Sequence, residues 1–551
     1  MNKHLCQLVV ILAGVGGLSN SSASGWQNRV FSWVPSVEYS VGDFLIHWEN
    51  TLLDGALRVY HQDEPSRELW ASIPGKAFIR GQQSDFDAHE SRGSFVIRSE
   101  VIESLSIQTV SFLVTHNGAL YIGGRLFNSW FTSHAYYIFA FRETDEGHLQ
   151  FETILWDSDC VTGNCTDKYN QTKLVYSSFA DEHFFGFGEQ FSHFDLKGHV
   201  VPILSEEGGL GRGRQPMTFL ANLMSSGSGG DAYTSYASIP HYLTSLGRSL
   251  FLESSEYSIF DLSDPESVEL VVQSPRVVGR ILYGKSPLEL IERYTEYSGR
   301  MPALPDWFNE GAIVGMQGGT NALYHYWAML EEYNTPLAAF WIQDWVGRRS
   351  TLLGSQLWWN WELDQEHYHS WDNLRSDLED ANIRIMGYVN SYLVDASSKE
   401  NFSRNLLQEA LDMDLLVKEN NGDPYFVVGT VFDAAMLDLT NPQTTQWFKS
   451  VIQEELIEKG FSGWMADFSE SLPFDAKLHS SEDAASYHNR YTEDWAKVNR
   501  EAIREAGREG DIVFFNRGGY TRSPRYSTLF WEGDQYVTWD RHDGFKSSIL
   551  G

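Results

Sequence analysis

The chain has few basic residues and no long apolar run. Its 551 residues include 41 Lys and Arg against 74 Asp and Glu, for a formal net charge of −33. Such a surface repels phosphates and anionic membranes, which excludes nucleic acid as a partner. No stretch reaches about 18 uninterrupted apolar residues, so we expect no membrane span. The sequence also lacks a metal-ligand cluster, a nucleotide-binding loop and a redox motif, and we expect no cofactor and no metal.

Cysteine is scarce, with three residues in the chain. Cys6 lies within residues 1–24, where one early lysine, an apolar run and then small residues have the layout of a signal peptide. We therefore expect a secreted protein. Cys160 and Cys165 remain, in the short polar loop "DCVTGNC". In a secreted chain they predict a disulfide, and a metal site there would lack nearby ligands.

Aromatic residues, by contrast, are abundant at 14% of the chain. They suit stacking against sugar rings, although aromatic-rich β-sandwiches have the same composition. Between residues 25 and 300, alternating and aromatic runs such as "HAYYIFAFRE" and "SVELVVQS" are separated by turn residues. This pattern predicts an N-terminal β-sandwich domain. The chain is long enough for a second domain, so we expect a multidomain protein.

The rhythm changes after "MPALPDW" at residues 301–307. Short apolar strands such as "AAFWIQDW", "IRIMGYVN" and "GWMADF" now alternate with helical segments. Repeating β-α units predict a (β/α)8 barrel of the TIM type over residues 301–551, with an excursion at about 391–440. A doubly wound sheet is the rival fold, but no G-x-G-x-x-G follows the first strand.

Polar residues stand at the end of each predicted barrel strand. They are Gln317, Gln343 with Asp344, Asn390, Asp467, Arg517 and Asp534. Helix capping would explain any one of them. Barrel strands, however, deliver active-site side chains at their carboxyl ends, so the agreement of six strands favours a single site.

Asp467 and Asp534 form the central pair of this site. Paired carboxylates are the minimum for glycoside hydrolysis, in which one attacks the anomeric centre and the other protonates the departing oxygen. Trp531 and a glycine bracket Asp534, and a partly apolar setting would raise its pKa toward that of a general acid. Arg517 would keep Asp467 ionised, although a purely structural Asp–Arg pair is the alternative. The walls of the pocket are expected to include Trp345, Trp359 and Trp531.

Three segments resemble a known family. "GWMADFSESLP" (463–473) is similar to the nucleophile segment of glycoside hydrolase family 31, the retaining α-glycosidases, and "FFNRGGYTRSPRYSTLFWEGDQ" (514–535) to its acid/base segment. "FGFGEQFSHFDLKG" resembles the substrate-side loop of that family's N-terminal sandwich. The resemblance implies a carbohydrate substrate, Asp467 as nucleophile and Asp534 as general acid/base, with support from Arg517 and Glu470. In a retaining enzyme the two carboxyl groups lie roughly 5–5.5 Å apart, whereas an inverting hydrolase would need more than about 6.5 Å.

Within the family, "GMQGG", "WIQDWVGRR" and "GSQLWWNW" resemble substrate-binding stretches of the sulfoquinovosidases, which release a sulfonated glucose. This implies a set of substrate-binding residues: Gln317, Gln343, Asp344, Gln356, Trp359 and Trp531. The bacterial enzymes carry Arg where this chain has Gln356, and neutral hydrogen bonds are roughly half as strong as charged ones. Arg348 or Arg349 could substitute. Sulfoquinovosides and neutral α-glucosides therefore both remain as substrates.

The resemblance further implies two more barrel strands beyond "HDGFKSSILG" (542–551). We expect about six βα units here, an incomplete barrel with exposed parallel edges. The alternative function is accordingly a non-catalytic or vestigial carbohydrate-binding protein. Two segments are expected to be ordinary surface: "HYHSW" (367–371), whose histidine spacing is poor for a metal, and the acidic helix of "SSEDAASYHNRYTEDW" (480–495).

Overall fold

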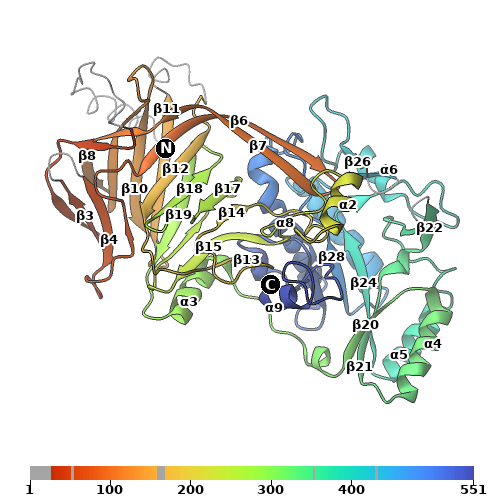
Figure 1. Ribbon diagram of the computed structural model, residues 1–551. Helices are drawn as coiled ribbons and strands as arrows, with labels where there is room; N and C mark the ends of the chain where they lie inside the picture. The colour runs from red at the N-terminus through yellow and green to blue at the C-terminus, as the bar shows by residue number, and fades with distance from the viewer. Residues whose placement is uncertain (1–26, 51–54, 158–167, 352–353, 429–431) are drawn as a thin grey trace.

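The computed structural model describes residues 27–50, 55–157, 168–351, 354–428 and 432–551. A β-rich region comes first, and a region of parallel strands and helices follows it (Figure 1). The multidomain architecture predicted from the sequence is therefore present. The expected signal peptide, residues 1–24, and the expected disulfide of Cys160 and Cys165 lie outside the described residues.

Three sheets form the first region, called here the sandwich region. The largest has nine strands in the order β1-β8-β9-β10-β11-β19-β16-β15-β13. Its strands are β1 Val30–Ser32, β8 Ile107–His116, β9 Ala119–Phe127, β10 His134–Glu143, β11 Leu149–Asp157, β19 Arg276–Leu282, β16 Ser249–Leu252, β15 Ser238–Thr244 and β13 Phe184–Gly188. The six-stranded sheet comprises β14 Val200–Ile203, β17 Ser258–Asp261, β18 Ser267–Val272, β12 Gln171–Ser177, β6 Ile79–Ser91 and β7 Ser94–Leu105. The third comprises β2 Val37–Val41, β3 Phe44–Glu49, β4 Ala56–His61 and β5 Trp70–Ala71.

Aromatic rings join these sheets face to face. Phe187 of β13 lies 5.1 Å from Phe260 of β17, and Trp70 of β5 lies 6.1 Å from Phe139 of β10, between ring centroids. All four side chains are buried in one hydrophobic core. Alternation of buried and half-buried residues along β11 and β15 leaves one face of each strand in this core, as expected for a sandwich.

The hairpin of β6 and β7 extends far beyond the sandwich and crosses to the second region (Figure 1). Its two-residue turn, Arg92 and Gly93, has φ values of 57° and 82°, the geometry of a tight hairpin turn. At the tip, the carbonyl of Gly93 accepts a hydrogen bond from the Glu207 amide at 2.8 Å. A Cβ atom on Gly93 would lie 2.9 Å from Ser471 Oγ, so the hairpin tip touches the segment that follows β28.

The second region, called here the barrel region, is built on six parallel strands that neighbour one another in chain order. They are β20 Ala312–Met316, β21 Leu337–Ile342, β24 Arg384–Asn390, β28 Gly463–Asp467, β29 Val513–Asn516 and β30 Leu529–Phe530. Helices lie between these strands, as in the first six units of a (β/α)8 barrel. All five residues of β28 are buried, which explains the continuous apolar run of "GWMA".

The remaining regular elements of the described residues are helices, short helical turns and smaller sheets. The helices are α2 Met217–Met224, α3 Pro287–Ser298, α4 Gly319–Glu332, α5 Trp371–Asp380, α6 Leu406–Asp412, α7 Pro442–Ile452, α8 Ala484–Glu505 and α9 Phe545–Leu550, with short 3-10 turns at Asp306–Asn309, Gln343–Val346 and Ser523–Arg525 and a π turn at Gln453–Ile457. The remaining strands are β22 Arg348–Thr351, β23 Gly354–Leu357, β25 Tyr392–Leu393, β26 Phe426–Val428 and β27 Asp433–Met436. Asn441 and Asp483 cap α7 and α8 through side-chain hydrogen bonds to backbone amides.

The expectation that α8 is a solvated helix is wrong. His488 and Asn489 are fully buried where α8 meets the sandwich region. Asn489 Oδ1 accepts a hydrogen bond from the Ser205 amide at 2.8 Å, and His488 Nε2 lies 2.8 Å from the Ser205 carbonyl. These polar side chains of the segment thus form hydrogen bonds with backbone groups of the other region and do not face water.

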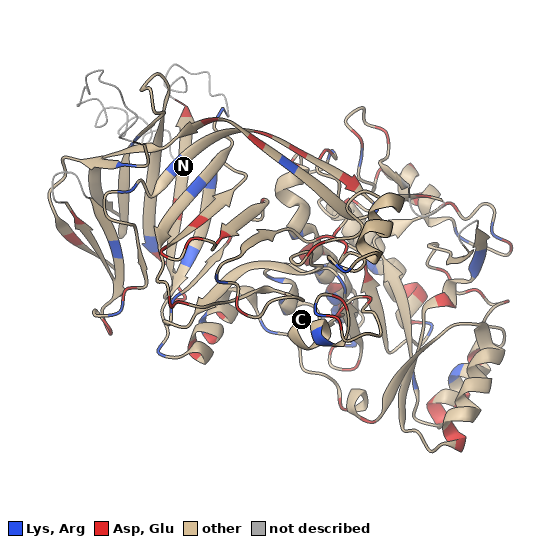
Figure 2. Cartoon of the chain, in the orientation of Figure 1, with Lys and Arg blue, Asp and Glu red and all other residues tan. Residues whose placement is uncertain are grey.

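Charge is spread over the whole molecule, with acidic residues on both regions (Figure 2). Within the described ranges, no helix has both the length and the apolarity that a bilayer crossing requires. The same part of the chain contains no group of three or more His, Cys, Asp or Glu side chains that could hold a metal ion.

Candidate active site

Asp467 is the last residue of β28, and two neighbouring strands orient its carboxylate. The Tyr388 hydroxyl, on β24, donates a hydrogen bond to Asp467 Oδ2 at 2.5 Å. Arg517, immediately after β29, places its Nε 3.3 Å from Oδ1. The side chain of Asp467 is nearly buried, with 6% of its area exposed. A buried carboxylate held by one hydroxyl and one cation is a fixed anion at the carboxyl end of the sheet.

Arg517 gathers three acids around one guanidinium. Besides Asp467, it pairs with Glu470 by a short contact and with Glu207 at 3.1 Å. Its guanidinium carbon lies 4.0 Å from the ring centre of Phe468. Burial alone would lower the pKa of Arg517, but the three carboxylates outweigh burial and raise it well above its usual range. Arg517 therefore stays charged and organises the acids around it.

Glu470 is fully buried next to this cation. Burial raises the pKa of Glu470 to about 7, with further increase from the charges of Glu207 and Asp467 and an opposing effect of Arg517. Its Oε2 has no hydrogen-bond partner among the described residues. Near neutral pH, Glu470 thus carries a proton part of the time, which limits the negative charge that the cluster must accommodate.

The turn directly after Asp467 is strained. Phe468 and Ser469 have φ values of 53° and 108°, in the left-handed region that non-glycine residues rarely adopt. Such positions cost about 1–3 kcal/mol each and persist only where the surrounding packing enforces them. The turn reverses the chain so that Glu470 returns to Arg517.

Asp534 lies on the loop after β30, four residues past the strand. The sequence placed it at the strand end itself, and that placement is wrong because β30 stops at Phe530. Its side chain is exposed. Partial burial together with the charges of Glu207 and Asp467 raises its pKa, against the effect of Arg517. The two aspartates are therefore within electrostatic reach of each other, and the pKa of the exposed one is shifted in the direction that suits a proton donor.

Tyr236, from the sandwich region, contacts both the acid cluster around Arg517 and the loop that carries Asp534. Its hydroxyl donates a hydrogen bond to Glu207 at 2.8 Å, and its ring centre lies 6.1 Å from that of Trp531. Gly533 has φ +76°, and a Cβ there would lie 2.5 Å from the Tyr236 ring. Only glycine allows the loop of Asp534 to pack this closely on the ring.

Gln317 and Gln343 follow β20 and β21 and meet each other. Gln317 Nε2 donates a hydrogen bond to Gln343 Oε1 at 2.9 Å. Gln317 is exposed and Gln343 is half-buried. The two amides thus present polar groups at the carboxyl edge of the sheet, on the strands where the sequence predicted substrate contacts.

Asp344 behaves differently from its neighbour Gln343, and its prediction as a substrate contact is wrong. Its side chain has no exposed area. Its carboxylate already accepts hydrogen bonds from Tyr368 Oη at 2.6 Å and the Gly318 amide at 2.8 Å, and lies 2.7 Å from His367 Nε2. Burial would raise the pKa of Asp344, but these partners lower it overall. Asp344 therefore fixes the loop after β20 from within.

The "HYHSW" segment, expected to be plain surface, supplies two of these partners. His367 and Tyr368 both point to Asp344, and Tyr368 is fully buried. The expectation failed because spacing along the sequence does not show that a distant carboxylate lies under the segment.

Gln356 lies on β23, directly opposite Arg349 of β22. The Arg349 guanidinium carbon lies 3.4 Å from the ring centre of Phe432 and 4.7 Å from that of Trp358. Burial lowers the pKa of Arg349 to about 10. Its Nε and Nη2 have no hydrogen-bond acceptor in the described part of the chain. An aromatic cage thus holds a cation beside Gln356.

Trp359 connects this hairpin to the segment that follows Asp467. Its ring centre lies 5.5 Å from that of Phe468, the residue after Asp467, and 5.1 Å from that of Phe432. Trp345, by contrast, is fully buried and donates its indole N–H to the Tyr388 carbonyl at 2.8 Å. Its predicted place in the pocket wall is wrong, since Trp345 belongs to the core that supports Tyr388.

Three residues at the site escaped sequence reasoning: Glu207, Tyr236 and Tyr388. Glu207 had a detectable signal, because two adjacent acids precede the glycine-rich run "GGLGRG". Tyr388 sits mid-strand in an apolar run, where a tyrosine is ordinary core. Nothing in its own segment marks Tyr236, which reaches the site through the meeting of the two regions.

Comparison with known families shows to which family the chain belongs. A family model described as the glycosyl hydrolases family 31 TIM-barrel domain matches residues 302–550. A second, described as the glycosyl hydrolase 31 N-terminal galactose mutarotase-like domain, matches residues 50–261. The chain belongs to glycoside hydrolase family 31. The resemblance drawn from the nucleophile and acid/base segments is thereby confirmed, as is the fold class of an N-terminal β-domain followed by a TIM-type barrel.

Curated relatives in family 31 include two sulfoquinovosidases. The one from Escherichia coli (strain K12) is 35% identical over 381 residues, covering 69% of this chain and 55% of the relative. The one from Agrobacterium fabrum is 34% identical over 387 residues, covering 69% and 56%. The chain thus spans about half the length of the curated relatives it matches.

A solved family 31 structure is similar over most of the chain. It is a sulfoquinovosidase from E. rectale in complex with an aza-sugar inhibitor, 30% identical, with a TM-score of 0.79. The alignment covers 90% of this chain and 70% of that one. Similarity at this level extends through both regions, so their arrangement is a family 31 arrangement.

Proposed function

We propose that this chain is a retaining α-glycosidase that hydrolyses O-glycosidic bonds of sulfoquinovosides or α-glucosides. The observation that carries the proposal is the unlike pair of carboxyl groups. Asp467 is fixed by Tyr388 and Arg517, whereas Asp534 is exposed and has a raised pKa. A retaining mechanism needs this division, one acid to attack and one to donate a proton.

In the first step, a carboxylate oxygen of Asp467 bonds to the anomeric carbon while the bond from that carbon to the aglycone oxygen breaks. The proton of Asp534 passes to the departing oxygen. In the second step, Asp534 takes a proton from water, and the water oxygen bonds to the anomeric carbon. The bond to Asp467 breaks and its carboxylate is restored, so configuration is retained after two inversions.

A sulfonated sugar is the substrate class that we favour within this proposal. The sulfoquinovosidase relatives support it. So does Arg349, a cation beside Gln356 with no carboxylate partner among the described residues. Partial burial of a cation that has no carboxylate partner among the described residues is costly, and an anionic group on the substrate would offset that cost.

The test is hydrolysis of two 4-nitrophenyl α-glycosides, one of sulfoquinovose and one of glucose, by the purified chain. Mass spectrometry identifies the products, and NMR of the first-formed sugar shows which anomer is released. Faster release from the sulfonated sugar, with the α-anomer first, is the expected result. Release of the β-anomer would contradict retention. Sugar binding by calorimetry without any release would favour the non-catalytic carbohydrate-binding alternative.

Arg349→Met sharpens the substrate class. We expect kcat/KM for the sulfonated glycoside to fall about tenfold or more, the scale of a charge-assisted contact, with little change for the glucoside. Arg276→Met, an exposed arginine on β19, is the matched control. Equal loss on both sugars would show that Arg349 supports the hairpin rather than an anionic substrate.

Secretion is a separate part of the proposal and rests on the composition of residues 1–24. N-terminal sequencing of the protein recovered from the culture medium tests it. A mature start near residue 25 is expected, and retention of Met1 inside the cell would contradict it.

A further inference from the structure

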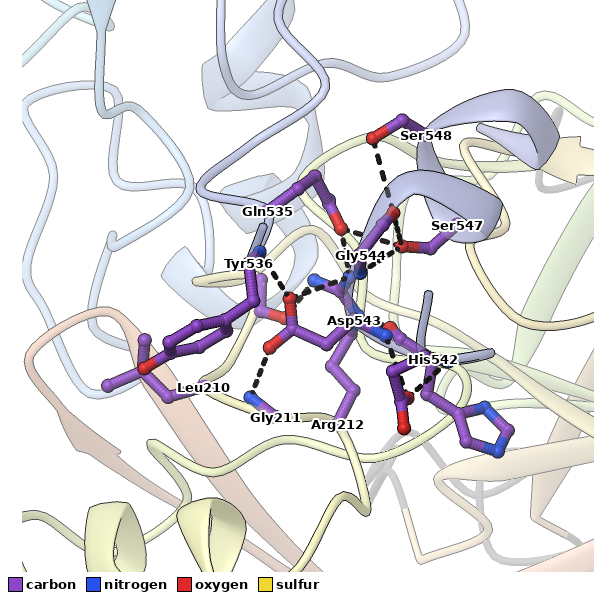
Figure 3. Close-up of polar contacts among 12 residues, drawn as sticks. Leu210, Gly211, Arg212, Gln535, Tyr536, His542, Asp543, Gly544, Ser547 and Ser548 are labelled. Atoms are coloured by element: carbon purple, nitrogen blue, oxygen red, sulfur yellow. Dashed lines mark hydrogen bonds and ion pairs between the residues drawn. The ribbon is translucent and has the colours of Figure 1, made fainter. Parts of the chain in front are cut away.

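A loop of the sandwich region holds the segment that carries Asp534 through buried hydrogen bonds (Figure 3), a set of contacts called here the grip. Arg212, with 1% of its area exposed, is the centre of this grip. Its Nη2 donates to Gln535 Oε1 at 2.6 Å, and its Nε donates to the His542 carbonyl at 2.7 Å. Its Nη1 donates to the Gly208 carbonyl at 3.2 Å within its own loop. One guanidinium thereby joins two segments more than 300 residues apart in the chain.

Asp543 is the counterpart of Arg212 and is fully buried. Its Oδ2 accepts from the Gly211 amide at 2.7 Å, and its Oδ1 accepts from the Tyr536 amide at 3.1 Å (Figure 3). The Arg212 Nη2 lies 3.8 Å from Oδ1. Each buried charge of this pair therefore has a partner, and removal of either would leave the other uncompensated.

The grip ends at the turn that contains Asp534. Gln535, bound by Arg212, donates its own Nε2 to the Glu532 carbonyl at 2.6 Å, so its side chain closes the turn on both sides of Asp534. The Asp534 carboxylate itself has no hydrogen bond to a described residue, and it is exposed. Its direction is consequently set by the backbone of residues 532–536 and by what holds that backbone.

We propose that Arg212 and Asp543 are positioning residues that aim Asp534 at the departing oxygen, an inference that rests on the proposed function. The barrel strand β30 ends too early to fix the acid, and the sandwich region supplies the missing constraint. Displacement of a catalytic group by about 1 Å costs on the order of a hundredfold in rate. Loss of the grip should therefore affect proton donation selectively.

The first experiment compares leaving groups on one sugar. Arg212→Met is assayed for kcat/KM on an alkyl glycoside, whose departing oxygen must be protonated, and on the 4-nitrophenyl glycoside, which needs little help. We expect a loss of at least about 30-fold on the alkyl glycoside and less than about 3-fold on the nitrophenyl glycoside. Equal losses on both would overturn the proposal, since general misfolding affects both. Arg212→Lys should recover part of the alkyl rate, and Arg276→Met should change neither.

The second experiment uses pH. The charge of Asp543 contributes to the raised pKa of Asp534. In Asp543→Asn that charge is gone, so the pKa of Asp534 falls and the basic limb of the kcat/KM profile for the alkyl glycoside moves to lower pH. An unchanged rate together with an unmoved basic limb would overturn the proposal.

The third experiment does not depend on turnover. In Arg212→Met, hydrogen–deuterium exchange should become faster in peptides covering residues 532–547 and stay unchanged in those covering 463–472. Unchanged exchange at 532–547 would overturn the proposal. Failure of the wild-type chain to hydrolyse either glycoside would instead contradict the proposed function, while the exchange result would still decide whether Arg212 holds the loop.

Discussion

The two aspartates of the site are the same residue type in opposite structural situations. Asp467 ends a fully buried strand, and its neighbours on β24 and β29 hold it directly. Asp534 lies on an exposed loop, and the residues that fix its backbone come from the sandwich region. A fixed anion belongs on a rigid strand, where its orienting groups cost no reorganisation. A proton donor must change charge twice in each cycle, and an exposed loop lets it do so.

The largest effect is expected from a substitution of Asp467, at the end of strand β28. Asp467→Asn removes the carboxylate that is proposed to attack the anomeric carbon and keeps the size of the side chain, so we expect kcat to fall at least about 10³-fold on both glycosides. Steady-state rates and circular dichroism measure turnover and folding. Asp423→Asn, which changes an exposed aspartate in the same way, is the control. A folded Asp467→Asn variant that keeps a tenth of the activity would remove Asp467 from the mechanism.

The next largest effect is expected from a substitution of Asp534, on the loop after β30, and its size depends on the leaving group. Asp534→Asn cannot donate a proton, so kcat/KM for an alkyl glycoside should fall about 10²–10⁴-fold. The 4-nitrophenyl glycoside should lose far less in kcat/KM, because nitrophenolate leaves without protonation. A uniform loss on both substrates would show that the two aspartates do not differ in role.

A smaller effect is expected from a substitution that tests whether a hydrogen bond fixes the carboxylate of Asp467. Tyr388→Phe removes the hydroxyl that contacts Asp467 and keeps the ring in the core. A hydrogen bond to a charged group contributes about 1.5–3 kcal/mol, so kcat should fall roughly 10–100-fold. Tyr60→Phe in the sandwich region serves as the control substitution. An unchanged kcat would mean that Arg517 alone orients the carboxylate.

The last expected effect is on stability rather than on rate and concerns Glu470. Its pKa is about 7 in the folded protein against an ordinary value of 4.5, so the folded state holds a proton that the unfolded state releases between these values. The free energy of unfolding therefore falls as pH rises through this window, by up to about 3 kcal/mol from this group. Glu470→Gln should flatten that fall, as measured by urea unfolding at pH 5 and pH 8. An identical slope in both proteins would place the pKa of Glu470 outside the window.

The sequence predicted the strand side of the site better than the loop side. The continuous apolar run before Asp467 required a buried strand, and a buried strand delivers its last residue to the sheet edge. The same argument, applied to β29, placed Arg517 at the edge of the sheet. The location of Asp534 past β30 was missed because β30 has only two residues, too few for a pattern.

The other failures of prediction share one cause, contact between segments remote in the chain. Asp344 looked available for substrate until His367 and Tyr368 proved to lie against it. Glu207 and Arg212 belong to a sandwich-region segment whose glycine-rich sequence marks it as a loop but does not show which segment it contacts. Periodicity shows which face of an element is buried but not which partner buries it.

The hairpin of β6 and β7 limits how freely this protein can be divided. Its tip lies against the segment after β28, beside the loop that supplies Glu207 to Arg517. A chimera that joined this barrel to another protein's sandwich would keep both aspartates and lose the groups that set their charge and direction. Recombination among relatives should therefore fail at crossovers between the two regions, because each region completes the site of the other.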